Sequence, residues 1–344
     1  MTKVIKIDPI KPESEKIALA ADLIKRGGLV ALPTETVYGL GADATDEHAA
    51  KKIYAAKGRP SDNPLIIHIA YPQDAEKYAY TSELYYKLAK AFMPGPLTVI
   101  MPKREIIPSS VTGGLDSVAV RCPSHPIARA LIEASGVAIA APSANLSGSP
   151  SPTSAEHVIS DLDGRVDMII DGGNSEIGLE STIVKINGDS LTLLRPGGIT
   201  YDALLCVCDK VDIAPAVTDK LAENERPLSP GMKYRHYAPS APLVLLDGEY
   251  EKVLAFMSDA QKTQNCAIIC FDEDAECLLK DKIITIGKKD DQAAQAAKLF
   301  SALRDADKLT ADIIYAHLPT KDGIGLALYN RMIRAAAHTI KKID

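Results

Sequence analysis

The sequence predicts an α/β protein with two domains, a larger one over residues 1–205 and a smaller one over residues 241–344. The length of 344 residues is more than one average domain. Strand-like and helix-like patterns alternate from residue 242 onward, which indicates a mostly parallel sheet. Residues 206–240 lack a clear period and are rich in proline, so we interpret them as a linker or lid.

Composition limits the classes of function. With 46% hydrophobic and 24% charged residues the chain is globular. The net charge of −6, the absence of Trp and the presence of only four Phe argue against a broad basic surface or stacking platform for nucleic acid. The start lacks the apolar core of a signal peptide, and no run of eighteen apolar residues occurs, so we expect a cytoplasmic protein without a membrane. The six cysteines form no Cys-x-x-Cys pair and are expected to be reduced thiols rather than a metal site.

The larger domain is expected to mix strands, helices and loops rich in Gly, Pro and Ser. We expect strands over residues 27–33, 63–70, 117–123 and 136–142, helices over 46–58, 125–136 and 153–164, and a hairpin over 181–198.

Local signals place the ends of these elements. Asp46 is a plausible N-cap and Gly58 a C-terminal stop for the first of these helices. Thr153 and Glu156 have capping-box spacing, and Asn187–Gly188 is the turn signal of the hairpin.

The smaller domain has the more regular pattern. We expect strands over 242–247, 266–271, 282–286 and 312–316, each followed by a helix with apolar positions at helical spacing, such as Ala293, Ala297, Phe300 and Leu303.

The segment "IYAAKGRPSDNPLIIHI" combines two cations with a sharp helix stop. Lys57 lies in the last helical turn, where a cation interacts favourably with the negative end of the helix dipole, so it needs no further role. Arg59 lies beyond Gly58 and is locked by Pro60, so the two cations form either a rigid anion site, suited to phosphate, or a surface corner. His68 shares a strand face with Ile66 and is either a satisfied histidine or a hydrogen-bond partner for a polar substrate.

Two further segments bring polar side chains together. In "AAPSANLSGSPSPTS", Ser143 and Asn145 project alike if the chain is extended, in a loop whose small residues allow a ligand to approach; the alternative is a flexible Ser/Pro loop. At the open end of the hairpin, Ser181 and Arg195 are nearly equidistant from the turn, so they should face each other, either as a site or as an ordinary cross-strand pair.

Common nucleotide motifs are missing. Gly39, Gly41 and Ala44 fit G-x-G-x-x-A, but "LPTETVY" separates them from the preceding strand, so we interpret the match as a false positive. The P-loop pattern, the G-x-S-x-G elbow and the H-E-x-x-H zinc motif do not occur.

Several segments in order along the chain resemble the YrdC-like family. They are "LPTETVYGLGADA", "KGRPSDNPLIIHI", "PGPLTVIM", "VAVRCPSHPIARALI", "APSANLSGSPSPT" and "GLESTIVKI" with "LLRPGGI". With "SPGMKYRHYAP" and the smaller α/β domain, nearly the whole chain is similar to two-domain members of that family. The resemblance implies a twisted open sheet with a concave cavity.

The resemblance also implies a reaction. L-Threonine, bicarbonate (or CO2) and ATP, with Mg²⁺, would give L-threonylcarbamoyladenylate and pyrophosphate. Partner tRNA threonylcarbamoyl-transferase proteins would pass the group to the tRNA adenosine next to the anticodon, and the chain itself could contact tRNA. Such chemistry needs no protein nucleophile, so we expect catalysis by positioning and charge neutralisation.

Site residues follow from the resemblance by position. The residues expected to contact ATP are Lys57 and Arg59 at the phosphates as catalytic groups, with Asn63, Ser117, Ser143, Asn145, Ser151, Arg195 and Tyr237. The residues expected to contact threonine are Thr36, His68, Arg121 and Ser181, with Arg121 pairing the carboxylate.

Two other functions compete with this reading. One is a non-catalytic module that binds double-stranded RNA or tRNA, which the acidic net charge and scarce aromatics disfavour. The other is carbamoyl transfer in hydrogenase maturation, which usually brings zinc-finger-like Cys motifs that this sequence lacks.

Overall fold

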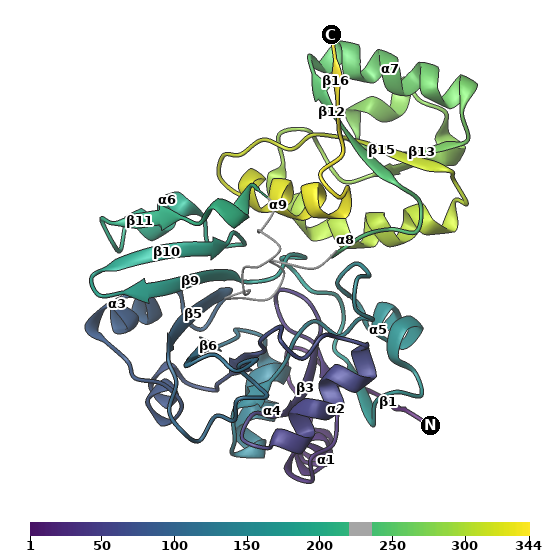
Figure 1. The fold of residues 1–344 in the computed structure, drawn as a ribbon. Coiled ribbons are helices and arrows are strands. Elements are labelled where there is room, and N and C mark those ends of the chain that lie inside the picture. Colours follow the sequence, from purple (N-terminus) through teal and green to yellow (C-terminus); the bar gives the residue numbers. More distant parts are fainter. Residues whose placement is uncertain (220–235) are drawn as a thin grey trace. The chain divides into compact units, whose positions relative to one another are not determined.

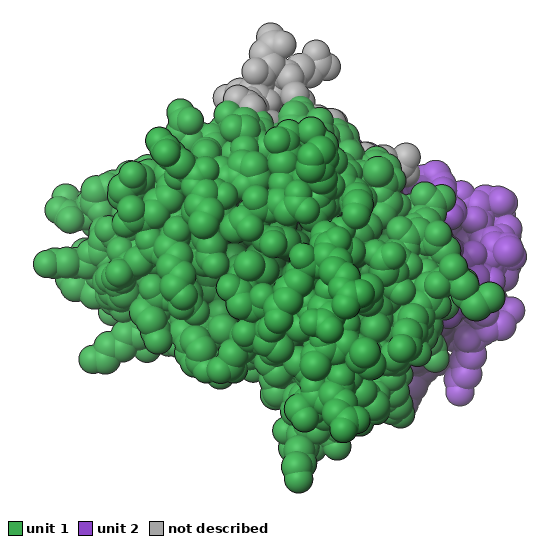
Figure 2. All heavy atoms as spheres, turned by 90° about the horizontal axis from the view of Figure 1, so that it is seen from below, with its two compact units in different colours: residues 1–147, 151–233 green, residues 148–150, 234–344 purple. Residues whose placement is uncertain are grey.

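The computed structural model describes residues 1–219 and 236–344, which form two compact units (Figure 1, Figure 2). Unit 1 contains residues 1–147 and 151–219, and unit 2 contains residues 148–150 and 236–344. Both units combine strands with helices, which confirms the predicted α/β class. The remaining part of the expected linker or lid, residues 220–235, lies outside the described residues.

Unit 1 is built on a mixed sheet of eleven strands (Figure 1). Its strands are β1 (Lys3–Lys6), β2 (Val30–Leu32), β3 (Gly39–Asp43), β4 (Ile66–His68), β5 (Leu97–Pro102), β6 (Ser117–Arg121), β7 (Ile139–Ala140), β8 (Met168–Asp171), β9 (Thr182–Asn187), β10 (Ser190–Arg195) and β11 (Val211–Ile213). Its helices are α1 (Ser14–Lys25), α2 (Glu47–Lys57), α3 (Glu83–Phe92), α4 (Pro126–Ser135), α5 (Ala155–Leu162) and α6 (Tyr201–Leu205), with 3₁₀ turns η1 (Pro72–Lys77) and η2 (Pro215–Val217).

The strand order is β1-β8-β2-β3-β7-β4-β6-β5-β9-β10-β11. The adjacent strands β4, β6, β5 and β9 span residues 66–187 of the sequence, and the sheet places them side by side. Strand β11 pairs in parallel with β10, and η2 follows it. Unit 1 therefore continues through residues 211–217, which the sequence had assigned to the linker.

Apolar side chains of α1 and α4 cover one region of this sheet. Their buried residues, with those of β2, β7 and β8, form one core cluster that includes Ile17, Ile24, Leu131, Leu32 and Ile170. The spacing of Ile17 and Ile24 is two helical turns, so both side chains lie on the same face of α1. A second, smaller cluster joins β4, β5, β6, β9 and β10.

The local signals are mostly confirmed. Asp46 accepts a hydrogen bond from the His48 backbone at the start of α2, and Gly58 ends that helix with φ of 63°. The hairpin turns at Gly188, whose φ is 60°. The capping-box prediction was wrong: the N-cap of α5 is Ser154, because the backbone N–H of Thr153 already donates to the His157 ring.

Unit 2 has a sheet of five strands in which every pairing is parallel, as predicted. Its strands are β12 (Leu243–Gly248), β13 (Cys266–Cys270), β14 (Ile283–Thr285), β15 (Ile313–His317) and β16 (Ile340–Ile343). Its helices are α7 (Tyr250–Thr263), α8 (Gln292–Lys308) and α9 (Gly325–Ala335), with 3₁₀ turns η3 (Glu273–Glu276) and η4 (Lys280–Lys282).

Two details of unit 2 differ from the prediction. Only the short turns η3 and η4 follow β13, where an α-helix was expected, and they make up the crossover to the parallel strand β14. On α8, Phe300 and Leu303 are buried as expected, whereas Ala293 is exposed and Ala297 half-buried. The buried stripe runs through Ala296 and Leu299 instead.

Within the described residues, no helix is long and apolar enough to cross a membrane.

Candidate functional site

The end of helix α2 is tied to the small-residue loop after β7. Lys57 is the last residue of the helix and is 2% exposed. Its ammonium donates to the backbone oxygens of Ser143 and Asn145 and to the Asn145 side-chain oxygen, at 3.2 Å. The backbone N–H of Ser147 donates to the Lys57 carbonyl at 2.9 Å. The cation therefore fixes the loop, and its contact with phosphates stays a prediction.

Ser143 and Asn145 lie on the same side of that loop, as the sequence predicted. The Ser143 hydroxyl donates to Asn145 Oδ1, and Asn145 Nδ2 donates to the Leu146 carbonyl at 2.7 Å. A backbone bridge between Gly39 and Ser143 joins the loop to β3. These contacts tie residues 143–146 to one another and to β3.

Arg59 turns toward the segment that precedes β4. Its guanidinium donates to the backbone oxygens of Asn63, at 3.4 Å, and Pro64, at 3.2 Å. Asn63 is 2% exposed, and its side-chain oxygen has no hydrogen-bond partner among the described residues. Buried polar atoms are normally satisfied, so this oxygen is a candidate to accept a hydrogen bond from a ligand. The two cations that the sequence grouped thus hold two different loops.

Three polar side chains form a row across β4, β6 and β5. His68 is paired in register with Arg121, and Arg121 with Thr98. Residues paired in register on neighbouring strands project from the same face of a sheet. The side chains of His68, Arg121 and Thr98 therefore share one face, and all three are buried.

Arg121 is paired with a carboxylate that the sequence did not single out. Its Nη2 lies 2.7 Å from Glu35 Oε1, with side-chain exposures of 5% and 6%. Arg121 Nε and Nη2 and both Glu35 oxygens have no well-aligned hydrogen-bond partner among the described residues. Burial alone would raise the pKa of Glu35, but the charge of Arg121 together with hydrogen bonding to the carboxylate outweighs it, and the pKa is lowered.

His68 has a defined tautomer. Its Nδ1 lies 3.3 Å from the Ile139 carbonyl, which can only accept, so Nδ1 carries the proton and Nε2 keeps a lone pair. Burial, and next the charge of Arg121, lower the pKa of His68 to about 3. The ring is therefore neutral at physiological pH and offers an acceptor at Nε2.

The predicted meeting of Ser181 and Arg195 is confirmed. Arg195 Nε donates to the Ser181 carbonyl at 3.0 Å, and Nη2 donates to the Ser181 hydroxyl at 3.2 Å. The ladder itself pairs Arg195 with Ile183, because the register shifts after Leu193. Ser181 Oγ also lies 2.7 Å from Thr98 Oγ1, which links the hairpin to the row of His68 and Arg121.

Thr36 presents a hydroxyl whose proton is already used. The Thr34 hydroxyl donates its proton to the Val37 carbonyl at 2.6 Å. In the 2.9 Å hydrogen bond between the two threonine hydroxyls, Thr36 Oγ1 is therefore the donor and Thr34 Oγ1 the acceptor. Thr36 can thus only accept from a ligand.

The remaining expected ATP contacts are more scattered. The Ser151 hydroxyl donates to Glu180 Oε1 at 2.6 Å, next to Ser181 in sequence. Ser117 begins β6, four residues before Arg121, and is half-buried. Tyr237 belongs to unit 2, where its buried ring lies 5.1 Å from that of Phe300. The ligand contacts expected of these residues stay predictions.

Glu35 and Thr98 are the functional candidates that sequence reasoning missed. Thr98 could have been identified from the sequence, because it is the one polar residue among apolar ones in the strand "PLTVIM". Glu35 carried no such signal, because its role depends on a long-range contact with Arg121.

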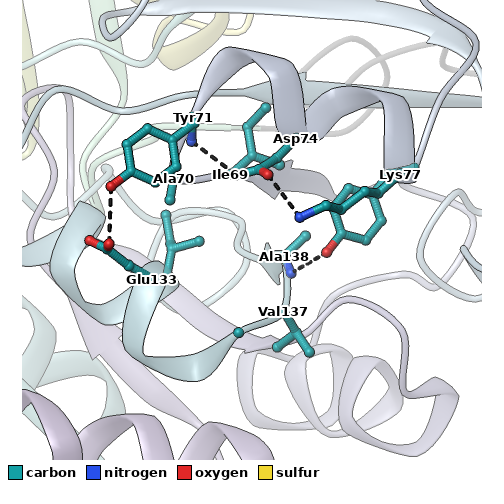
Figure 3. Close-up of a pocket in the computed structure, with 11 residues that line it drawn as sticks. Ile69, Ala70, Tyr71, Asp74, Lys77, Glu133, Val137 and Ala138 are labelled. Atoms are coloured by element: carbon teal, nitrogen blue, oxygen red, sulfur yellow. Dashed lines mark hydrogen bonds and ion pairs between the residues drawn. The ribbon is translucent and has the colours of Figure 1, made fainter.

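A hollow of about 200 Å³ lies just beyond the end of β4 (Figure 3). Its polar side chains are largely paired with one another: Tyr71 donates to Glu133 at 3.0 Å, and Lys77 to Asp74 at 2.9 Å. None of the predicted site residues lines it.

No group of three or more His, Cys, Asp or Glu residues within residues 1–219 and 236–344 could hold a metal ion. The Mg²⁺ ion expected with ATP would be held mainly by the phosphates of the nucleotide and stays a prediction.

Comparisons with known proteins show the family of the chain. The Sua5/YciO/YrdC family model, described as "Telomere recombination", matches residues 22–197, and the model "Threonylcarbamoyl-AMP synthase, C-terminal domain" matches residues 199–337. The chain is 46% identical to threonylcarbamoyl-AMP synthase of Pyrococcus abyssi over 96% of this chain and 97% of that one. It is 45% identical to that of Bacillus subtilis, with coverage of 96% and 95%. The crystal structure of P. abyssi Sua5 complexed with L-threonine superposes over both whole chains with a TM-score of 0.93 at 44% identity.

Proposed function

Because the chain belongs to the threonylcarbamoyl-AMP synthase family, we propose that it forms L-threonylcarbamoyladenylate and pyrophosphate from L-threonine, bicarbonate or CO2, and ATP. The product would serve tRNA threonylcarbamoyl-transferase proteins, which modify the adenosine next to the anticodon. We propose that this reaction takes place in the cytoplasm and that the protein can contact tRNA directly.

The observation that carries the proposal is the state of Arg121. It is a buried guanidinium whose charge is balanced by Glu35 but whose Nε and Nη2 lack hydrogen bonds among the described residues. Unsatisfied donors in a buried ion pair are costly unless a ligand completes them. The carboxylate of an amino acid supplies two acceptors in the geometry that a guanidinium matches.

The other groups suit the rest of threonine. The ammonium group can donate to Glu35 and Thr36, which only accept. The neutral ring of His68 accepts at Nε2, and the hydroxyl of Ser181 lies on the same side of the sheet as the Arg121 row. A hydroxyl-bearing substrate would satisfy such a site, whereas valine would leave polar groups unpaired.

ATP would bind beside this subsite. Arg59 and Arg195 supply charge for the phosphates, and Asn63 supplies an unsatisfied acceptor. Lys57 acts as a positioning residue, because it holds Ser143 and Asn145 in place. Mg²⁺ would arrive with the phosphates of ATP.

The chemistry then proceeds without a protein nucleophile. The threonine ammonium group gives up one proton to become the nucleophilic amine, which adds to the carbon of CO2, and loss of a second proton gives a carbamate; both protons leave to solvent. A carbamate oxygen attacks the α-phosphorus of ATP, and pyrophosphate leaves. The residues named here orient the reactants and neutralise charge, which accounts for catalysis of this kind.

Pyrophosphate release tests the proposal. With ATP and bicarbonate present, L-threonine should drive release far faster than L-valine does, and omission of bicarbonate should abolish the difference. Equal release with both amino acids would contradict the substrate assignment. Release that needs neither amino acid nor bicarbonate would contradict the reaction itself.

A further inference from the structure

Unit 2 contains a cavity of about 270 Å³ at the carboxyl ends of its parallel strands. The residues that line it include Asp247 near the end of β12, Phe271 directly after β13, and His317 at the end of β15. The chain leaves β12 for β13, on the far side of β15, and leaves β15 for β16, on the far side of β12. In open α/β sheets, ligands bind in the crevice where neighbouring strands send the chain in opposite directions.

The polar side chain of His317 is rigidly held at this cavity. Its Nε2 lies 2.9 Å from Asp274, a carboxylate with 0% exposure that also accepts from the Tyr250 hydroxyl and the Phe271 backbone. Hydrogen bonds from His317 and Tyr250 overcome the effect of burial and lower the pKa of Asp274. An ionised Asp274 accepts the Nε2 proton, so Nδ1 is the acceptor of the neutral ring.

Aromatic packing fixes the same ring. His317 is stacked between Phe271, with ring centres 4.7 Å apart, and Tyr250, at 5.7 Å. The Lys289 ammonium lies 3.6 Å from the centre of the Tyr250 ring. The loop that carries Lys289 is held from behind, because Gln295 donates to the carbonyls of Lys288 and Lys289. The wall of the cavity is therefore preorganised.

Two opposite charges in the wall remain without an ionic partner. Asp247 and Lys289 both line the cavity, and neither forms an ion pair with any residue in the described ranges 1–219 and 236–344. By contrast, Gln292 is already engaged: it donates to the Thr320 hydroxyl at 3.1 Å and accepts from the Gly325 backbone at 2.9 Å. The groups left for a ligand are one carboxylate, one ammonium and the His317 ring.

A nucleotide does not suit this cavity. The end of β12 and the residue after it read Asp247-Gly248-Glu249, so carboxylates stand where a glycine-rich turn would hold phosphate. The N-terminus of α8 is closed by Asp291, which accepts from Ala294. An anionic phosphate would be repelled by these carboxylates.

We propose that unit 2 binds a free L-amino acid in this cavity, with its ammonium group toward Asp247 and its carboxylate toward Lys289. The apolar part of the wall, formed by Leu246, Leu318 and Leu328, would receive the side chain. The two charges of the cavity sum to zero, as do those of the zwitterion, and its volume suits a small metabolite better than a cofactor.

Methyl NMR on the full chain tests this proposal. The standard L-amino acids are added one at a time, and the methyl signals of Leu246, Leu318 and Leu328 are followed. At least one amino acid should shift them, and its amide and its N-acetyl derivative, which each lack one charge, should not. The shifts should persist in Arg121→Gln, which separates this site from the threonine site proposed in unit 1.

Two variants and matched controls complete the test. Asp247→Asn and Lys289→Met should each raise the dissociation constant about tenfold or more, because each removes one charged contact. Asp259→Asn and Lys262→Met, at an exposed ion pair on α7, should leave it unchanged. The proposal is overturned if no amino acid shifts the three leucines, if the variants bind like their controls, or if AMP or inorganic phosphate shifts them instead.

Discussion

Glu35 and Arg121 form an ion pair in the interior of unit 1, with Oε1 and Nη2 2.7 Å apart, although Arg121 Nε and Nη2 and both Glu35 oxygens have no well-aligned hydrogen-bond partner among the described residues. The pair balances the two charges and leaves their hydrogen-bonding capacity available. This is the state expected of a subsite that is completed by a ligand with both a carboxylate and an ammonium group.

Glu35→Gln should destabilise the protein without ligand. The substitution leaves Arg121 as an uncompensated buried charge, and we expect the free energy of unfolding to fall by about 3 kcal/mol. Denaturant unfolding measures this free energy, and Glu47→Gln, at an exposed side chain, is the control. The double variant Glu35→Gln/Arg121→Met should recover part of the loss, because no unpaired charge remains. Unchanged stability in Glu35→Gln would show that the pair does not act as described.

Acid should weaken the protein partly through the same carboxylate. The pKa of Glu35 is lowered in the folded state, so its contribution to stability is present above the unfolded pKa and is lost as pH falls through the folded pKa. The stability of wild type should therefore fall more steeply than that of Glu35→Gln as the pH drops below about 4.5. Parallel curves for the two proteins would contradict the shift.

His68 should stay neutral across the physiological range. Its pKa is lowered to about 3, so the unfolded chain takes up a proton near pH 6.5 whereas the folded chain does not. The contribution of His68 is therefore full above pH 6.5 and is lost progressively as pH falls toward 3. Imidazole ¹⁵N shifts should report a single neutral tautomer with the proton on Nδ1 from pH 8 to pH 5. A titration midpoint near 6.5 would mean that the ring is not enclosed as the structure has it.

Lys57→Met should loosen the loop that contains Ser143 and Asn145. The methionine keeps the apolar stem and removes the ammonium that satisfies the loop oxygens, each of which is costly to leave unpaired, at about 1–3 kcal/mol. Hydrogen exchange of residues 143–147 should become faster. Lys51→Met, at an exposed ion pair on the same helix, is the control. If residues 143–147 were equally protected from hydrogen exchange in both variants, the positioning role of Lys57 would be contradicted.

Arg59→Ala should impair turnover while the fold persists. The loss of a charge near the phosphates is expected to lower kcat about 10²–10³-fold. The melting temperature should change little, because Arg59 is half-buried and its guanidinium bonds to Asn63 and Pro64 stay within one local segment. A collapse of the melting temperature together with activity would instead favour the surface-corner reading of "KGRP".

The sequence was sufficient where short-range chemistry decides the structure. Asp46, Gly58 and Gly188 act through their own backbone conformations, so the ends of α2 and the hairpin turn could be predicted. The meeting of Ser181 and Arg195 followed from symmetry about the turn, and the bulge near Leu193 altered only the register.

Contacts between residues far apart in the chain could not be predicted from local sequence patterns. The cation of Lys57 binds a loop 86 residues away, which no local pattern indicates. The pairing of Glu35 with Arg121 depends on the strand order of the finished sheet. The spacing of Thr153 and Glu156 predicts a capping box, but it does not indicate the hydrogen bond from the Thr153 backbone N–H to the His157 ring.

The most direct test of the central claim is mass spectrometry of the products made from ATP, L-threonine and ¹³C-bicarbonate. Wild type should give threonylcarbamoyladenylate that carries the label, and Arg121→Gln should give little of it at the same threonine concentration while it remains folded. A wild-type reaction that releases pyrophosphate but yields no labelled adenylate, or an Arg121→Gln variant as active as wild type, would contradict the account.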